Sequence, residues 1–453
     1  MKPSLPKGTR DFGPNEVNKR SFIFSTIKEV FVRYGYQPIE TPTMENLSTL
    51  TGKYGEEGDK LLFKVLNNGD YLAKANEEAL NAKDSVKLIS SISKRGLRYD
   101  LTVPFARFVV MHQNDIAFPF KRYQIQPVWR ADRPQKGRYQ EFYQCDVDVV
   151  GSNSLTHEAE LTQIYDEVFA KLGIEVIIKI NNRKILAGIA EVAGIADKMV
   201  EMTVAIDKLD KIGLDGVKKE MASRDISDAS IETIIEILQI EDLAGLKDKF
   251  QSSEMGLKGI EELEKVFTYF KPADAKNKVK FDITLARGLS YYTGCIFEVA
   301  VDTGIESQKD VVMGSIGGGG RYDDLTGIFG MKDMSGVGVS FGAARIFDVM
   351  EELNLFPQED ENSLKVLFIA FDDQSHEYAF QCLTKVRAAG INAEIYPDPV
   401  KLKKQMKYAN ARQVPHVILI GDSEMESGNL TLKDMKEGGQ EALSLDDIIT
   451  KLK

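Results

Sequence analysis

One short segment combines an aromatic ring, an amide and two carboxylates at alternating positions. It is EFYQCDVDVV, residues 141–150. If it is a strand, a single face carries all four of these side chains, Phe142, Gln144, Asp146 and Asp148. Burying unpaired carboxylates is costly, so the row is either an exposed sheet face or part of a site that offers hydrogen-bond acceptors to a ligand. The row alone leaves both interpretations open.

The loop before this segment, RADRPQKGRYQ at 130–140, concentrates positive charge. Only Asp132 interrupts its basic side chains, which are Arg130, Arg133, Lys136 and Arg138. Guanidinium groups present planar pairs of donors that suit phosphate, and a neighbouring ring such as Phe142 can stack on a nucleobase. The loop therefore predicts a nucleotide site, with a solvated hairpin tip as the alternative.

An arginine beside two phenols marks a second candidate site. In LARGLSYYTG, residues 285–294, Arg287 follows an alternating strand-like run and precedes Tyr291 and Tyr292. An arginine placed at a strand end beside paired tyrosines is typical of a binding site rather than of a surface that serves solubility.

Two glycine-rich segments follow. GSIGGGGRYDDL, residues 314–325, has four successive glycines that permit close backbone approach to a ligand. It fits neither the dinucleotide fingerprint nor the phosphate loop, which disfavours a Rossmann dehydrogenase and a P-loop NTPase. In GVGVSFGAARI, residues 336–346, the glycines favour a structural role, and Arg345 falls where a helix begins.

The composition excludes several classes of protein. Over 453 residues, 58 basic and 69 acidic side chains give a net charge of -11, so we expect any polyanion to be bound by local basic patches. The 3 Cys and 4 His show no zinc or metalloprotease spacing, which predicts no protein-held metal and no disulfide scaffold. No signal-peptide pattern and no run of about 18 apolar residues occurs, so we expect a soluble cytoplasmic protein that does not enter a membrane.

Hydrophobic periodicity predicts the elements that position these residues. Apolar side chains at helical spacing indicate helices over 15–34 and 157–172, and the extended runs on both sides of the basic loop predict an antiparallel hairpin. Further strands are expected over 278–287, 295–302 and 336–344.

The changes in texture along the chain predict its domains. A β-rich domain over 1–181 and 271–350 is interrupted by a Lys/Glu-rich helical insertion over 182–270. An acidic, Pro- and Asn-containing linker over 351–363 leads to an α/β domain over 364–453, in which β-α-β-α-β alternation is expected.

The last domain contains a basic amphipathic helix. Residues 399–414 have no acid, and Leu402, Met406 and Ala409 keep one side of the helix apolar. Such a helix can contact RNA phosphates, although a merely solvated helix fits the pattern equally well. The candidate contacts are Lys403, Lys404 and Lys407.

In this order, the segments resemble the class II aminoacyl-tRNA synthetases, and among them the histidyl-tRNA synthetase family. The resemblance spans nearly the whole chain, from LPKGTRDF near the start through RYDLTVPFARF at 98–108 to LARGLSYY and GGGGRYDDL. It implies an α+β fold with an antiparallel catalytic sheet, a helical insertion and a C-terminal α/β domain of the anticodon-binding type. It also implies that a homodimer activates L-histidine with ATP and Mg2+ to histidyl-adenylate and transfers it to tRNA(His).

The resemblance also implies roles for single residues. The catalytic groups would be Arg130 and Arg287, both stabilising charge on the α-phosphate. Phe142 would stack on adenine, and the ATP contacts would be Arg130, Asp132, Arg138, Phe142 and Arg345. The histidine contacts would be Asp100, Thr102, Gln144, Asp148, Tyr291, Tyr292 and Tyr322. Besides the lysines of the basic helix, the tRNA contacts would be Arg133 and Gln135.

Two alternatives remain beside this hypothesis. A non-catalytic, synthetase-like regulator of histidine biosynthesis would be expected to lack the anticodon-type domain and some of the arginines, which this chain retains. A class II enzyme for another amino acid is disfavoured by LARGLSYY. The chain departs from the family pattern at Ala344, where an acid commonly precedes the arginine, and at Asp100, where many bacterial members carry Glu.

Overall fold

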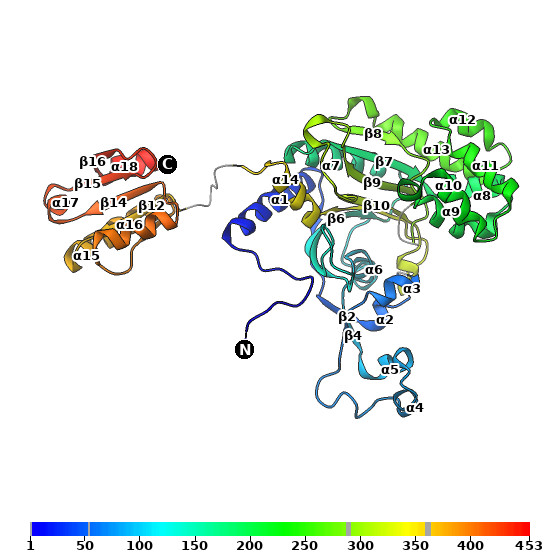
Figure 1. The fold of residues 1–453 in the computed structure, drawn as a ribbon, viewed down its shortest axis with the longest axis horizontal. Helices are drawn as coiled ribbons and strands as arrows, with labels where there is room; N and C mark the ends of the chain where they lie inside the picture. The colour runs from blue at the N-terminus through cyan, green and yellow to red at the C-terminus, as the bar shows by residue number, and fades with distance from the viewer. Residues whose placement is uncertain (1, 53–54, 287–290, 358–363) are drawn as a thin grey trace. The chain divides into compact units, whose positions relative to one another are not determined.

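The structure is a computed structural model that describes residues 2–52, 55–286, 291–357 and 364–453 (Figure 1). The chain forms two compact units, residues 1–356 and 357–453. Among the described helices, none is both long enough and apolar enough to cross a membrane.

An eight-stranded sheet forms the centre of the first unit. Its strands lie in the order β1-β5-β6-β11-β10-β9-β7-β8, and neighbours are antiparallel except for the parallel pairs β1–β5 and β7–β8. The predicted hairpin is confirmed as β5 and β6. The strands are β1 (Gln37–Pro38), β5 (Phe120–Trp129), β6 (Glu141–Val150), β7 (Val176–Asn182), β8 (Lys278–Phe281), β9 (Cys295–Val301), β10 (Gly317–Tyr322) and β11 (Gly336–Gly342).

One expectation about this sheet was wrong. The strand predicted over 278–287 ends at Phe281, because Asp282 turns the chain: its carboxylate accepts hydrogen bonds from the amide and hydroxyl of Thr284 at 3.1 and 2.6 Å. The glycine run at 317–320 forms the first part of strand β10. A Cβ at Gly319 would lie 2.2 Å from the carbonyl oxygen of Gly338 on the neighbouring strand, so glycine is required for the two strands to pair.

Three helices pack beside the sheet, and two of them share an aromatic core with it. Phe341 of β11 contacts Phe31 of α1 and Tyr165 and Phe169 of α7, with ring centroids 4.7–5.8 Å apart. The helices predicted over 15–34 and 157–172 are confirmed, and the second ends at Gly173, whose φ of 72° is left-handed. The helices are α1 (Pro14–Arg33), α7 (Thr156–Leu172) and α14 (Ala343–Glu352).

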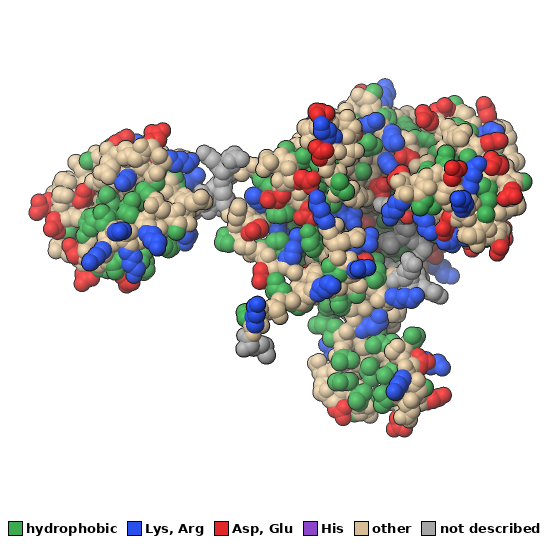
Figure 2. Space-filling view, in the orientation of Figure 1, with side chains coloured by type: hydrophobic (Ala, Val, Ile, Leu, Met, Phe, Trp, Pro, Cys, Tyr) green, Lys and Arg blue, Asp and Glu red, His purple; other side chains and the backbone are tan. Residues whose placement is uncertain are grey.

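Residues 44–97 form a lobe that the sequence analysis does not predict. Its three-stranded sheet has the order β2-β4-β3, and its strands of two or three residues are too short to show a hydrophobic period. Figure 2 shows large apolar side chains on its surface, which are Leu66, Tyr71, Leu72, Leu80 and Val86. The elements are β2 (Met44–Asn46), α2 (Leu47–Leu50), α3 (Gly55–Lys60), β3 (Lys64–Val65), α4 (Glu77–Asn81), α5 (Ser85–Ile92) and β4 (Arg95–Leu97), followed by α6 (Thr102–Met111).

Helices fill the chain between β7 and β8, where the insertion is expected. They share one hydrophobic core with the sheet, through residues such as Ile185, Ile234 and Leu263. They are α8 (Arg183–Val192), α9 (Met199–Ile206), α10 (Leu209–Ala222), α11 (Asp228–Leu238), α12 (Leu243–Lys249) and α13 (Glu254–Tyr269). Short 3-10 turns lie at Ala196–Lys198, Pro272–Asp274, Glu306–Gln308 and Thr326–Phe329.

The second unit has its own five-stranded sheet, in the order β13-β12-β14-β15-β16. The first three strands are parallel and alternate with helices, which confirms the predicted β-α-β-α-β run, while β15 and β16 add an antiparallel hairpin. The elements are β12 (Val366–Ala370), α15 (Asp373–Ala388), β13 (Ala393–Ile395), α16 (Leu402–Ala411), β14 (His416–Ile420), α17 (Asp422–Ser427), β15 (Asn429–Asp434), β16 (Gln440–Ser444) and α18 (Leu445–Leu452).

Candidate active site

Two adjoining cavities lie over strands β6, β10 and β11. The larger has a volume of about 500 Å³ and the smaller of about 120 Å³. They are continuous at their lining, because four residues belong to both: Arg130, Gln144, Gly318 and Ser340. Ligands in the two cavities would therefore share these four residues at the junction.

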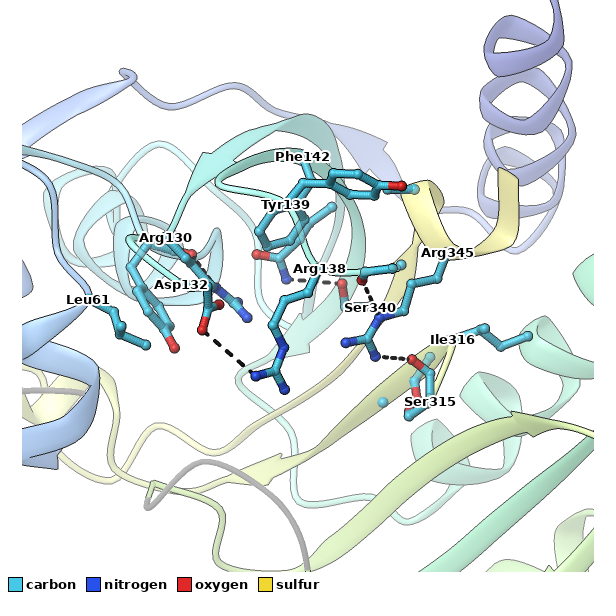
Figure 3. Close-up of a pocket in the computed structure, with 17 residues that line it drawn as sticks. Leu61, Arg130, Asp132, Arg138, Tyr139, Phe142, Ser315, Ile316, Ser340 and Arg345 are labelled. Carbon is cyan, nitrogen blue, oxygen red and sulfur yellow. Dashed lines mark hydrogen bonds and ion pairs between the residues drawn. The ribbon is translucent and has the colours of Figure 1, made fainter. Parts of the chain in front are cut away.

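The larger cavity gathers three guanidinium groups (Figure 3). Arg130 and Arg138 come from the β5–β6 connection, and Arg345 comes from the first turn of α14. The Nε of Arg345 donates to the carbonyl of Gly137 at 2.8 Å, and its Nη1 donates to the carbonyl of Ser315. These contacts aim the charge of Arg345 into the cavity, where the positive end of the helix adds to it.

Aromatic rings and a single acid complete this lining. The Arg130 guanidinium lies 4.3 Å from the ring centroid of Tyr99 and 5.1 Å from that of Phe142, while its Nε donates to the carbonyl of Tyr99 at 3.1 Å. Asp132 lies 4.0 Å from Arg138. Three cations, one carboxylate and a flat ring suit an anionic ligand that carries an aromatic base.

The lobe supports this cavity from one side. The amide of Ala131 donates to the carbonyl of Leu61 at 2.9 Å, and the Leu61 side chain lines the cavity. The start of the basic loop is thereby tied to the lobe, which gives the lobe a role in placing Arg130.

The smaller cavity is acidic. Asp100, Asp146 and Asp148 line it while exposing only 2%, 2% and 3% of their surface. The hydroxyl of Tyr322 donates to Oδ1 of Asp148 at 2.8 Å, and the hydroxyl of Tyr291 donates to Oδ2 of Asp100 at 3.4 Å. Because the carboxylates are buried, the interpretation of the β6 row as an exposed sheet face was wrong.

Two buried acceptors of this cavity, Oε1 of Gln144 and Oδ2 of Asp148, receive no hydrogen bond from the described residues. Oδ2 of Asp148 does form an ion pair with Nη2 of Arg122, which lies 2.8 Å away. The amide nitrogen of Gln144 is fixed by Ser340 Oγ at 3.1 Å, so its oxygen is held in place. Buried acceptors without donors favour a ligand that brings N–H groups, such as an ammonium or an azole ring.

The ionisable groups of the smaller cavity have shifted pKa values. Burial raises the pKa of Asp146 to about 7 and also raises the pKa of Asp148, while Arg122 opposes both shifts. Burial likewise raises the pKa values of Tyr292 and Tyr322, so both phenols stay neutral and can donate at pH 7.

The structure brings most of the candidate residues to these two cavities. Asp132, Arg138, Phe142 and Arg345 line the larger one alone, and Asp100, Thr102, Asp148, Tyr291, Tyr292 and Tyr322 line the smaller. Arg287 lies outside the described residues. Arg133 and Gln135 line neither cavity and are exposed in the loop, and the three lysines of α16, all exposed, belong to the second unit.

One glycine that the site requires is not among the site residues predicted from the sequence. Gly338 of β11 lies directly opposite Asp148 of β6, and a Cβ there would sit 2.0 Å from Oδ1 of Asp148. The motif GVG was interpreted as structural packing, whereas this glycine lines the smaller cavity and makes room for its carboxylate. In the sequence, this role is indicated only by small residues at alternating positions, Gly336, Gly338 and Ser340, which lie on one face of the strand.

The described parts of the chain contain no group of three His, Cys, Asp or Glu side chains placed to hold a metal ion. Asp132 is the carboxylate that lines the larger cavity. One carboxylate beside a phosphate site fits Mg2+, which usually binds through one or two carboxylates together with substrate phosphates and water.

Comparisons with known proteins agree with one another. The family model described as histidyl-tRNA synthetase matches residues 8–75 and 69–346, and the model of the anticodon binding domain matches residues 365–453. A curated histidine--tRNA ligase from Phocaeicola vulgatus is 58% identical over 457 residues, covering 100% of this chain and 99% of the relative. A curated histidine--tRNA ligase from Christiangramia forsetii is 57% identical and covers 100% of both chains.

A solved structure extends the agreement to the fold. The crystal structure of histidyl-tRNA synthetase from Nostoc sp. PCC 7120 superposes with a TM-score of 0.82 at 28% identity, over 100% of this chain and 99% of that one. The fold is therefore that of the class II synthetases, as the sequence predicted. With the family model matching most of its length and its relatives more than half identical, this chain belongs to the histidyl-tRNA synthetase family.

Proposed function

We propose that this protein activates L-histidine with ATP and transfers it to tRNA(His) for translation in the cytoplasm. One observation carries the proposal: a cationic cavity and an acidic cavity share Arg130 and Gln144 at their junction. An adenylate-forming enzyme needs this arrangement, because the carboxylate of the amino acid must meet the α-phosphate of ATP between the two binding sites.

The larger cavity would hold ATP. Phe142 is placed to stack on adenine, Arg130 to hold the α-phosphate beside the junction, and Arg345 to reach the γ-phosphate, with further contacts from Asp132 and Arg138. Mg2+ bound to the phosphates would have Asp132 as its protein carboxylate and would supply charge neutralisation. The assignment of Arg287 to the α-phosphate is proposed from the family resemblance.

The smaller cavity would hold histidine. Asp100, Thr102 and Gln144 would accept hydrogen bonds from the α-ammonium group close to the junction, and Asp148 and Tyr292 would contact the imidazole at the far end. Tyr291 and Tyr322 would complete the walls. A pocket that hydrogen-bonds both ends of its ligand rejects analogues lacking those groups.

The reaction would then proceed in two transfers. A carboxylate oxygen of histidine attacks the α-phosphorus, the new P–O bond forms histidyl-adenylate, and the bond to pyrophosphate breaks. Arg130 is placed to stabilise the charge that develops on the α-phosphate oxygens. In comparable sites, each such donor lowers the activation free energy by roughly 3 kcal/mol. A ribose hydroxyl at the 3' end of the tRNA next attacks the carbonyl carbon, and AMP leaves.

The tRNA contacts and the assembly are part of the same proposal. Arg133 and Gln135 are exposed at the tip of the hairpin beside the larger cavity, where an acceptor end must arrive. Lys403, Lys404 and Lys407 form an exposed basic face on α16, within the segment that matches the anticodon binding domain. A homodimer is proposed from the family resemblance.

Pyrophosphate exchange measured with each amino acid in turn tests the activation step. We expect ATP formation from labelled pyrophosphate with histidine alone, and charging of tRNA(His) with histidine in a second assay. Arg130→Met serves as the inactive control. Exchange with another amino acid, or with none, would overturn the proposal, and the absence of exchange is also the behaviour expected of the regulator alternative.

A further inference from the structure

Among the described residues of the first unit, three arginines are buried. Arg98 and Arg122 expose 0% of their surface and Arg321 exposes 4%. A guanidinium group loses its water when it is buried, so the protein must supply partners for its N–H groups or direct its charge at an anion. How each arginine is partnered indicates what it does.

Arg98 and Arg321 hold chain segments together. Arg98 donates to the carbonyl oxygens of Pro127 and Thr41 at 2.8 and 2.6 Å, and to Oε1 of Gln126 at 3.0 Å. Arg321 donates to both carboxylate oxygens of Glu158, at 2.5 and 2.7 Å, and also to Ser335. Both arginines are structural ties between segments distant in the sequence.

Arg122 of β5 is partnered differently. Its hydrogen bond to Oε1 of Gln124 is long, at 3.5 Å, and neither Nε nor Nη2 has a hydrogen-bond partner among the described residues. Its guanidinium carbon lies 4.2 Å from the ring centroid of Phe105, and its Nη2 lies 2.8 Å from Oδ2 of Asp148 as an ion pair. The main polar interaction of Arg122 is therefore its charge on one carboxylate of the smaller cavity.

Most of the surroundings of the Asp148 carboxylate disfavour its ionisation. Asp146 on the same strand and Asp100 before α6 add negative charge, and Tyr36 and Tyr292 face it with neutral phenols, whereas the hydrogen bond from Tyr322 favours the ionised form. Burial raises the pKa of Asp148, and the Arg122 charge is the largest opposing influence. Without the charge of Arg122, the pKa of this crowded and buried acid would be raised further.

We propose that Arg122 is a positioning residue for histidine recognition, which keeps Asp148 ionised and oriented so that Oδ2 accepts a hydrogen bond from the imidazole N–H. Arg122 lines neither cavity, so it acts through Asp148 and not by contact with substrate. The hydroxyl of Tyr322 donates to Oδ1, whereas Oδ2 is paired with the charge of Arg122 but accepts no hydrogen bond from the described residues and can accept one from the ligand. This inference rests on the proposed function and assigns a residue that sets the specificity of the same site.

Arg122→Met tests the proposal, since methionine fills much of the space without charge, and Arg122→Lys is the matched variant that keeps the charge. The KM for histidine, the KM for ATP and kcat are measured by pyrophosphate exchange between about pH 6 and pH 9. Dividing each variant value by the wild-type value at the same pH cancels the titration of free histidine.

For Arg122→Met we expect a rise in the KM for histidine of about 10- to 100-fold near neutral pH, as for a lost hydrogen bond to a charged group. The ratio should shrink as the pH rises, because Asp148 then loses its proton without help from Arg122. The KM for ATP and kcat at saturating histidine should stay within about twofold of wild type, and Arg122→Lys should recover most of the affinity.

Arg98→Met is the control for loss of a buried arginine. It should lower the melting temperature, while its KM for histidine relative to wild type should not depend on pH. The proposal is overturned if the KM for histidine of Arg122→Met, divided by the wild-type value, does not change with pH. It is also overturned if Arg122→Lys loses as much histidine affinity as Arg122→Met. If Arg122→Met does not fold, Arg122→Gln replaces it under the same criteria. A wild type inactive with histidine contradicts the proposed function itself, whereas these variant results contradict only the role of Arg122.

Discussion

The position of Gly338 gives the sharpest prediction about the site. Adding one methyl group by Gly338→Ala would place a Cβ 2.0 Å from Oδ1 and 2.3 Å from Cγ of Asp148, and 2.9 Å from the carbonyl oxygen of Val147. All three distances are shorter than van der Waals contact. The strand cannot shift without breaking its pairing with β6 and β10, so the Asp148 side chain must move.

Moving Asp148 breaks two interactions of known length. They are the 2.8 Å hydrogen bond from Tyr322 and the 2.8 Å ion pair with Arg122. A hydrogen bond to a charged group is worth about 1.5–3 kcal/mol, so the KM for histidine should rise about 10- to 150-fold if the imidazole loses an equivalent bond. Gly338 does not line the larger cavity, so the KM for ATP should change little.

The assay is pyrophosphate exchange at varied histidine with saturating ATP, and then the reverse, with melting temperatures measured alongside. Gly439→Ala is the control, because a Cβ there meets nothing within 4 Å. A KM for histidine within about twofold of wild type would refute the reasoning. If Gly338→Ala does not fold, Tyr322→Phe tests the same carboxylate without adding an atom, and it should raise the same KM.

Three further predictions concern Asp146, Arg287 and the basic face on α16. Burial raises the pKa of Asp146 to about 7, so its proton stabilises the ligand-free protein most at acid pH and this contribution is lost as the pH rises through 7. Asp146→Asn should therefore flatten the pH dependence of the urea midpoint between about pH 4 and pH 7, and an unchanged slope would contradict this assignment. Arg287→Ala should lower kcat for activation far more than histidine affinity, and an equal loss in both would exclude a role in the transition state. Reversing the charge of the basic face on α16 should weaken tRNA binding and reduce its salt dependence without changing pyrophosphate exchange, as measured for the triple variant of Lys403, Lys404 and Lys407 to Glu.

Local sequence patterns predicted the elements that depend on local forces. The hairpin of β5 and β6 and the helices α1 and α7 follow from alternation and helical spacing, and each occurs where it is expected. The lobe at 44–97 was missed because its strands are too short to carry a pattern. Its role beside Arg130 depends on a backbone contact between Leu61 and Ala131, which no side-chain pattern reveals.

The pairing of strands that are distant in the sequence could not be predicted either. The row on β6 was recognised, but its burial depends on β11, which lies almost two hundred positions later in the chain and pairs Gly338 with Asp148. For the same reason, a glycine that leaves space for a ligand and one that leaves space for a neighbouring strand look alike in a sequence. Gly319 leaves space for the neighbouring strand, whereas Gly338 leaves space in the binding site. Only the cross-strand register distinguishes the two roles.

The β6 row also explains how one strand can order two substrates. Phe142 and Gln144 line the larger cavity, Gln144 also lines the smaller one, and Asp148 lies at its far end. At about 3.3 Å per residue, the six steps from Phe142 to Asp148 span about 20 Å, which is a suitable length for a nucleotide and an amino acid placed end to end. Because side chains alternate, a shift of one residue in the pairing of β6 would turn the whole row into the aromatic core behind the sheet. The register of β6 against β5 and β11 therefore fixes the position of the nucleotide base, the junction and the imidazole together, and substitutions that weaken this pairing should impair both substrates at once.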